Sequence, residues 1–180
     1  MSEIIEQARA FIDAAYGATD AKGLAHSREV GDLLAALGCD EDVVATGLLH
    51  DVVEDTGTDV ETLRQKFGDQ IADLVYALSE DEAIADYAER KRALREGVAI
   101  AGPTALTISA ADKVSRLRAA DRAGKVVPER KLLHYQQTAD LLVAQGITSP
   151  HVAEIQRRLR NRRLQRPAEA AAAPAAPAAG

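Results

Sequence analysis

The sequence predicts an all-α domain of about eight or nine helices, on three grounds. Apolar side chains recur at the three- and four-residue spacing of amphipathic helices along most of the chain, whereas the alternating pattern of strands is nearly absent. Glycines and prolines fall between these periodic segments, where helices are expected to end or begin. A length of 180 residues, 47% of them hydrophobic, suits a single domain with one core.

Each periodic segment defines one expected helix. In chain order these helices cover residues 3–16, 24–37, 41–53, 58–67, 69–78, 81–100 and 104–120, and two more begin near Pro128 and Pro150. Gly38 is expected to end the second helix, because glycine is the usual residue after a helix C-terminus. Thr58, with Glu61 three residues later, predicts a capping box at the start of the fourth.

The domain is expected to span residues 3–165, followed by an Ala/Pro-rich tail over residues 166–180. This last segment has no large apolar side chain to bury, and its prolines interrupt helices. We therefore expect the tail to be disordered.

The formal charge of −6, from 22 Lys+Arg and 28 Asp+Glu, is unevenly distributed. Residues 157–180 carry +5, so the remaining residues carry −11. Because an acidic surface repels phosphate, nucleic acid is not an expected partner. The arginine-rich residues 157–166 leave one alternative open, namely binding of RNA or of an acidic partner.

Composition also bears on the compartment. A single Cys excludes an internal disulfide framework and cysteine-based zinc clusters. No apolar run approaches the roughly 18 residues of a membrane span, and the N-terminal segment is acidic where a signal peptide is basic. We therefore expect a cytoplasmic protein without a membrane partner, and a homo-oligomer stays open.

The segment TGLLHDVVEDT, residues 46–56, contains the polar groups that indicate chemistry. It embeds the pairs His50-Asp51 and Glu54-Asp55 in an apolar helix that should be buried. On a continuous helix these side chains lie three or four positions apart and would share one broad face. Their burial is costly unless they are paired or bind a metal ion. An acidic helix end beside a satisfied core histidine is the alternative interpretation.

Two residues elsewhere favour the metal. His26 lies on the preceding expected helix, and Asp112 follows an apolar stretch. Alone, the first could be a surface residue and the second a partner of Arg116. With His50 and Asp51 they form a set of two imidazoles and two carboxylates that suits a divalent ion such as Mn, Fe, Co or Zn.

The order His, His-Asp, Asp resembles that of the HD-domain metal-dependent phosphohydrolases. The run LLHDVVEDT, residues 48–56, is particularly similar to the hydrolase domains of RelA/SpoT-type enzymes and to their small stand-alone (p)ppGpp hydrolase relatives. Further matches are Phe67-Gly68, Glu89-Arg90-Lys91, Ala111-Asp112-Lys113 and residues 135–142. The resemblance covers about residues 20–160 and implies an HD-domain helical bundle.

The resemblance also implies roles for individual residues. One divalent metal ion, expected to be Mn2+, would be held by His26, His50, Asp51 and Asp112. Glu54 and Asp55 would be the catalytic carboxylates that orient or deprotonate a water activated by the metal. The substrate would be a small nucleotide that loses its 3′-pyrophosphate. Basic candidates for binding it are Arg28, Arg90, Lys91, Lys113 and Arg116.

The remaining histidines argue for a single metal ion. No histidine lies between His50 and Asp112 to supply a second site, and His134 and His151 are expected to be surface or core residues.

The family pattern is broken where the base would bind. The Arg-Lys-x-Gly-x-Pro-Tyr stretch that usually precedes the first metal histidine is missing, and Arg116 occupies a position that is typically Asn. We expect Arg116 to contact substrate, with a salt bridge to Asp112 as the alternative. Two other functions stay open: an HD phosphohydrolase for a different nucleotide or phosphate ester, and a non-catalytic nucleotide-sensing module.

Overall fold

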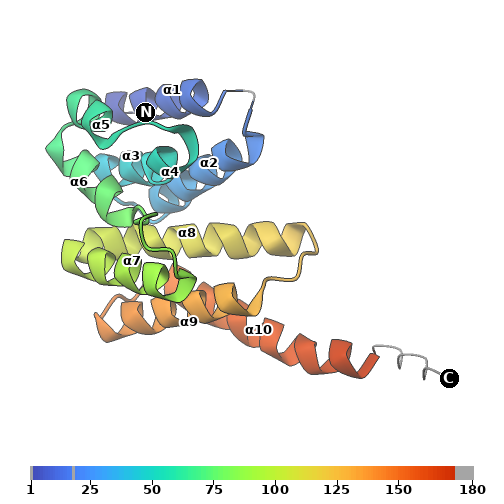
Figure 1. Cartoon of the computed structure of the whole chain (residues 1–180). Coiled ribbons are helices and arrows are strands. Elements are labelled where there is room, and N and C mark those ends of the chain that lie inside the picture. The colour runs from blue at the N-terminus through green and yellow to red at the C-terminus, as the bar shows by residue number, and fades with distance from the viewer. Residues whose placement is uncertain (1, 18, 173–180) are drawn as a thin grey trace.

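The computed structural model describes residues 2–17 and 19–172, with side chains up to residue 162. All regular secondary structure in these residues is helical, which confirms the expected fold class (Figure 1). The helices are α1 (Glu3–Tyr16), α2 (Ala21–Ala36), α3 (Glu41–Leu49), α4 (Val52–Thr56), α5 (Val60–Phe67), α6 (Asp69–Leu78), α7 (Tyr87–Ala101), α8 (Pro103–Arg122), α9 (Glu129–Ala144) and α10 (Pro150–Ala172).

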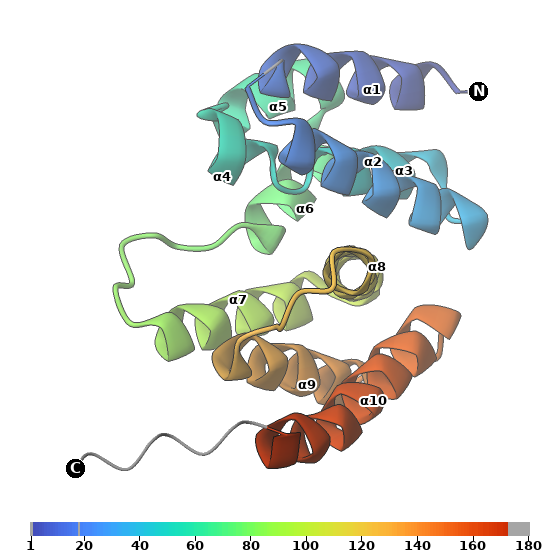
Figure 2. The ribbon, with the colours of Figure 1, turned by 90° about the vertical axis from the view of Figure 1, so that its right-hand side faces the viewer.

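Helix α8 lies at the centre of the bundle. Figure 2 shows it end-on, between a group formed by α1–α6 and a group formed by α7, α9 and α10. It contacts α2, α3, α6, α7, α9 and α10. Its buried apolar side chains, including Ile108, Val114 and Leu117, belong to one core cluster, and a second cluster joins α1, α3, α5 and α6. A polar residue on α8 can therefore lie between two apolar cores.

Two glycines allow α2 and α3 to pack closely. A Cβ atom on Gly31 would lie 2.5 Å from Leu48 Cδ2, and one on Gly47 would lie 2.2 Å from Leu34 Cδ1. Both leucines are fully buried, so they have little room to move aside. The close approach matters because α2 carries His26 and the end of α3 carries His50.

The expectation of one continuous helix over residues 41–53 is wrong. Helix α3 ends at Leu49 and α4 begins at Val52, which adds one helix to the expected number. The His50 ring supplies a physical reason, since its Nδ1 lies 2.8 Å from the Gly47 carbonyl oxygen. In a continuous helix the Asp51 N–H would take that carbonyl. The break changes how the following carboxylates are presented.

The segment before α7 was expected to be helical from residue 81, and it is not. Helix α7 begins at Tyr87 rather than near residue 81, because the Asp86 side chain caps it by accepting from the Glu89 N–H at 2.9 Å. The connection over residues 79–86 is held by Arg90, whose guanidinium donates to Glu80 and to the Ile84 carbonyl.

The predicted capping box at α5 is wrong in its first residue. Asp59, not Thr58, is the N-cap and accepts from the Thr62 N–H at 2.6 Å. The Thr58 hydroxyl instead lies 2.8 Å from that of Thr56.

The C-terminal helix runs past the expected domain boundary. The α10 backbone is helical through Ala172, in keeping with the high helix propensity of alanine. Residues 173–180 of the expected tail lie outside the described residues. Arg158 and Arg162, from the arginine-rich segment, both donate to Asp121 on α8. Among the described residues, no helix combines the length and apolar content that crossing a membrane requires.

Candidate metal centre

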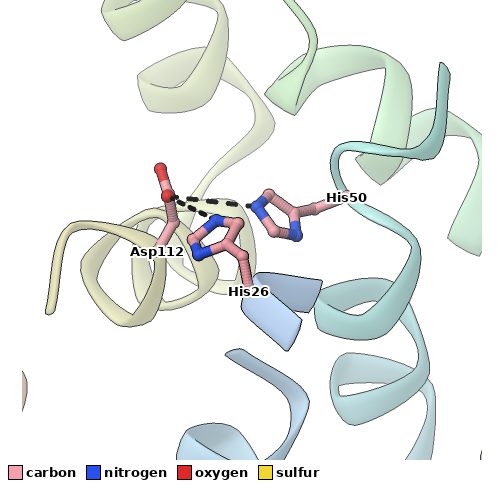
Figure 3. A group of neighbouring side chains, drawn as sticks. All are labelled: His26, His50 and Asp112. Carbon is pink, nitrogen blue, oxygen red and sulfur yellow. Dashed lines mark ion pairs between the residues drawn. The ribbon is translucent and has the colours of Figure 1, made fainter. Parts of the chain in front are cut away.

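Three residues from separate helices meet at the boundary between the two cores. His26 lies on α2, His50 directly after α3, and Asp112 on α8 (Figure 3). One potential ligand atom from each lies within 4.8 Å of the others. Asp112 Oδ1 is 3.2 Å from His26 Nε2 and 4.0 Å from His50 Nε2. The three side chains thus converge on one point.

The fourth expected ligand, Asp51, lies beside both histidines. Its Oδ2 is 3.4 Å from His26 Nε2, and its Oδ1 is 3.2 Å from His50 Nε2. His50, Asp51 and Asp112 are all buried, at 2%, 6% and 7% exposure. The structure therefore brings together all four residues expected to bind the metal.

The hydrogen bond of His50 fixes which ring nitrogen can bind a cation. Its Nδ1 lies 2.8 Å from the Gly47 carbonyl oxygen, which can only accept, so Nδ1 carries the proton. Nε2 is then the unprotonated nitrogen, and it is the atom that faces Asp51 and Asp112. A histidine ligand is commonly oriented in this way, by a carbonyl bound to its other nitrogen.

A relay of two residues orients His26 in the same sense. Ser115 Oγ lies 2.9 Å from Glu29 Oε2 and 2.9 Å from His26 Nδ1. Because a carboxylate can only accept, the single hydroxyl proton points to Glu29, and His26 Nδ1 must donate to the hydroxyl oxygen. Sequence reasoning missed both Ser115 and Glu29, since nothing in their spacing indicates a shared contact.

These orientations fit a metal ion. His26 Nε2 and His50 Nε2 are buried and have no hydrogen-bond partner among the described residues. A neutral ring at either position presents a lone pair to carboxylate oxygens, an arrangement that is repulsive unless a proton or a metal ion lies between them. Asp112 and Asp51 raise the pKa of His26 against the effect of burial. The cluster therefore favours a positive charge, and its donor set suits a divalent ion.

Arg116 supplies positive charge to the same carboxylates. Its Nε donates to Asp112 Oδ1 at 2.8 Å, and its Nη2 donates to Asp51 Oδ2. Although burial opposes the charge on these carboxylates, both pKa values lie well below their usual range. For Asp51 the main cause is His50, followed by His26 and then Arg116, and for Asp112 it is Lys113, followed by Arg116. The guanidinium and a divalent ion would use the same oxygens. From the sequence, Arg116 was expected to contact substrate, with a salt bridge to Asp112 as the alternative. The structure shows the salt bridge.

The two expected catalytic carboxylates line the cavity beside this cluster. The cavity has a volume of about 230 Å³. Glu54 accepts from the Glu80 N–H at 2.7 Å, and Asp55 accepts from the Tyr16 hydroxyl at 3.1 Å. Partial desolvation, and then the nearby charge of Asp51, raise the pKa of both Glu54 and Asp55.

Tyr16 is a further residue that sequence reasoning missed. It lies on the apolar face of α1 and is 1% exposed, so its spacing indicates only a core position. Its hydroxyl nevertheless fixes Asp55 from a helix far away in the sequence.

The five basic candidates for substrate binding divide into two groups. Lys91, Lys113 and Arg116 line the cavity. Arg28 and Arg90 are not among the lining residues: Arg28 donates to Asp13 at 2.6 Å, and Arg90 holds the connection before α7. The cavity also contains Lys131, His134 and Tyr135 of α9, and Tyr87 at the start of α7.

A family comparison agrees with this geometry. Residues 5–141 match the model of the HD domain family. The chain belongs to the HD domain family. The four expected ligands His26, His50, Asp51 and Asp112 all lie within the matched residues.

Two relatives show more specifically which proteins the chain resembles in sequence. The chain is 37% identical, over 95 residues, to the guanosine-3′,5′-bis(diphosphate) 3′-pyrophosphohydrolase MESH1 of Drosophila melanogaster, an alignment that covers 52% of each chain. It is 33% identical, over 98 residues, to a probable GTP pyrophosphokinase of Mycobacterium leprae, covering 53% of this chain and 12% of that protein. The chain thus spans about half or less of the length of these curated relatives.

Solved structures extend the similarity to the whole bundle. A structure described as a metazoan ortholog of SpoT that hydrolyses ppGpp superimposes with a TM-score of 0.76 at 25% identity, covering 90% of this chain and 97% of that one. A protein from Listeria monocytogenes matches with a TM-score of 0.67 at 28% identity, covering 76% and 97%.

Proposed function

We propose that this HD-domain chain is a metal-dependent phosphohydrolase that removes the 3′-pyrophosphate from guanosine-3′,5′-bis(diphosphate) or a closely similar nucleotide. One observation carries the proposal: the buried Nε2 atoms of His26 and His50 have no hydrogen-bond partner among the described residues and face the carboxylates of Asp51 and Asp112. His50 and both of these carboxylates line one cavity together with Glu54 and Asp55. The similarity to MESH1 proteins supports the choice of substrate.

The residues of the chain divide the chemistry between them. His26, His50, Asp51 and Asp112 would hold the ion, for which we propose Mn2+. When bound, this ion would acidify a water molecule and polarise a phosphoryl oxygen. Glu54 and Asp55 would accept the proton of that water, and their raised pKa values bring them closer to the operating pH of a general base.

The overall reaction is a hydrolysis. The water oxygen forms a bond to the phosphorus attached to the 3′ oxygen, and the bond between that phosphorus and the 3′ oxygen breaks. A proton goes to the 3′ oxygen, and pyrophosphate leaves. Lys91 and Lys113 line the cavity, where Lys91 pairs with Glu80 and Lys113 with Asp112. Both lysines would offset the charge of the phosphates when the substrate binds beside these pairs.

A substrate panel tests the proposal. Purified chain with Mn2+ is offered ppGpp, pppGpp and a set of other nucleotides, and pyrophosphate release is followed by ³¹P NMR. We expect release from the guanosine bis(diphosphates), and none from the His50→Ala or Asp51→Ala variants. Metal content by elemental analysis accompanies each assay. A metal-loaded chain that hydrolyses no member of the panel would overturn the proposal.

The position of Arg116 favours one second candidate, a nucleotide-sensing module without turnover. Because Arg116 bonds to Asp51 and Asp112, it would oppose metal binding at the oxygens that catalysis needs. This candidate predicts tight nucleotide binding by calorimetry, no metal by elemental analysis and no hydrolysis. Retention of metal after dialysis would exclude it.

The location of the protein is also part of the proposal. We propose that the chain acts in the cytoplasm, a reducing compartment that suits its single free cysteine. Fractionation of cells that produce the tagged full chain is expected to recover it there.

A further inference from the structure

His134 is a buried side chain of the cavity that the hydrolytic mechanism does not use. It lies on α9, is 4% exposed, and lines the cavity together with Lys131 and Tyr135. Lys131 lies three positions before His134 and four before Tyr135, so it neighbours both side chains on the helix surface. The sequence alone had suggested a plain surface or core residue.

The partner of the His134 ring fixes its tautomer. Arg95 Nη1, from α7, lies 2.9 Å from His134 Nδ1. A guanidinium has only donors, so Nδ1 must accept and the ring proton is on Nε2. Burial, followed by the charges of Lys113, Lys91 and Arg95, lowers the pKa of His134 to about 2, so the ring is neutral.

The resulting Nε2–H group has no partner. It is buried without a hydrogen-bond acceptor among the described residues. The two nitrogens of an imidazole point in different directions. Arg95, which binds Nδ1, lines a neighbouring cavity of about 280 Å³ and not this one, whereas His134 lines both. An unpaired buried donor is destabilising, and such groups in native proteins usually have a reason.

A second cavity residue has the same property. The hydroxyl of Tyr87, in the first turn of α7, is buried and unpartnered within the described part of the chain, and Tyr87 also lines the cavity. Burial raises the pKa of this hydroxyl, so it stays a donor. Lys91 lies over the same ring, with its Nζ 5.6 Å from the ring centroid. The cavity lining between α7 and α9 therefore contains two neutral donors, with Lys91, which pairs with Glu80, beside one of them.

From these contacts we propose that His134 Nε2–H and the Tyr87 hydroxyl form a subsite for a phosphate oxygen, with Lys91 as the neighbouring charge. The ligand is a pyrophosphate group, and its assignment to the substrate rests on the proposed function. A pyrophosphate oxygen can accept from neutral donors such as these, which attract it even though Lys91 and Lys113 are paired with the cavity carboxylates Glu80 and Asp112.

NMR of the full chain with ¹⁵N-labelled histidine and Mg2+ tests the subsite without requiring turnover. We expect the free protein to show His134 protonated at Nε2. Addition of inorganic pyrophosphate or GDP, which would be the two products of the proposed hydrolysis, should shift the Nε2–H proton. The probe that causes the larger shift identifies which pyrophosphate group the subsite takes. No shift with either probe would overturn the proposal.

Binding measurements on variants complete the test. His134→Leu should weaken pyrophosphate binding about 10- to 100-fold, the usual loss for a hydrogen bond to a charged group. Tyr87→Phe should weaken it as well. The side-chain N–H₂ of His134→Gln can occupy a similar position, so this variant should bind pyrophosphate with an affinity within about threefold of the parent chain. It also keeps the test possible if the leucine variant does not fold.

His151→Leu is the matched control. His151 is a buried histidine of α10 with an unpartnered ring nitrogen, and it lies outside the cavity lining. This variant should bind pyrophosphate as the parent chain does. Equal weakening in His134→Leu and His151→Leu would reduce the role of His134 to core packing. A pyrophosphate response at His134 in a chain that hydrolyses no nucleotide would retain the subsite and reject the proposed function.

Discussion

Two sites in this protein present the same imidazole atom, Nε2, with opposite chemistry. One is the metal cluster, which here means the four expected ligands His26, His50, Asp51 and Asp112, and the other is the α7–α9 wall of the cavity. At the metal cluster, the neutral rings of His26 and His50 carry their proton on Nδ1, which donates to a hydroxyl or a carbonyl oxygen. Their Nε2 atoms are then unprotonated. At the α7–α9 wall, formed by Tyr87, Lys91, Lys131 and His134, the ring presents Nε2–H, because Nδ1 accepts from Arg95. The first arrangement suits a cation and the second an anion.

This difference teaches that the outer hydrogen bond, rather than the histidine itself, decides the ligand. All three Nε2 atoms are buried and have no hydrogen-bond partner among the described residues. The group bound to Nδ1 differs between the two sites, and so do the charges around Nε2, which are carboxylates at His26 and His50 and lysines near His134. Variants that change either the metal cluster or the α7–α9 wall, and leave the other intact, test this contrast.

The largest effect is expected from His50→Ala, which removes one imidazole from the metal cluster. Metal binding by calorimetry should be lost, and hydrolysis should fall by about 10³-fold or more, since a bound ion contributes several kcal/mol to transition-state stabilisation. The parent chain should gain about 2.7 kcal/mol of stability at a metal concentration 100 times the Kd, and the variant none. His151→Ala should keep both properties; metal bound normally by His50→Ala would contradict the assigned cluster.

Glu54→Gln and Asp55→Asn separate proton transfer from metal binding. Each should lower kcat by about 10²- to 10⁴-fold, the usual contribution of a general base, while the metal affinity changes little. Tyr16→Phe, which removes the hydrogen bond to Asp55, should have a smaller effect in the same direction. Stopped-flow or ³¹P NMR rates beside calorimetric metal affinities provide the check, and a parallel loss of metal would assign these carboxylates to the cluster instead.

His134 should make the stability of the protein depend on pH. Its pKa is about 2 in the folded chain, against an ordinary value of 6.5, so below pH 6.5 the unfolded chain binds a proton that the folded chain does not. The free energy of unfolding should therefore fall with decreasing pH, by up to about 1.4 kcal/mol per pH unit below 6.5. Urea unfolding at pH 7.5, 6.5 and 5.5 should show this slope in the parent chain and a shallower one in His134→Gln. Identical slopes would mean that His134 is protonated in the folded state.

The smallest of these effects is expected from Arg116→Gln. Removing the guanidinium frees the oxygens of Asp51 and Asp112, so Mn2+ should bind more tightly, by about 10-fold for the loss of one competing charged contact. The metal-free variant should also unfold at a lower temperature, because two buried carboxylates each lose one of their charged partners. Arg118→Gln is the matched control, since Arg118 lies on the same helix but pairs with Glu154. Unchanged or weaker metal binding in Arg116→Gln would show that Arg116 does not compete.

The residues proposed to perform chemistry were largely predictable, and those that orient them were not. His50 and Asp51, with Glu54 and Asp55, stand in one short motif, so local spacing identifies them. Their presentation was predicted less well, because the His50 side chain interrupts the helix that should have continued through Asp51. A side chain that binds its own backbone overrides the periodicity of the segment.

The basic residues illustrate the other limit. Arg28 and Lys91 are equally charged and equally plausible from the sequence, yet one pairs with Asp13 on α1 and the other lines the cavity. His134 and Arg95 are 39 positions apart and belong to no motif. Contacts of this kind depend on which faces of α7 and α9 meet.

By itself, the sequence determined the helical class and identified the candidate metal ligands and the two neighbouring carboxylates, because helical periodicity and ligand chemistry are local properties of residue type and spacing. The tertiary structure alone decided which ring nitrogen each histidine presents, that Tyr16 holds Asp55, and that Arg116 bonds to the cluster. Those features arise where separate helices pack, and the direction of a hydrogen bond is fixed only when both of its partners are in place.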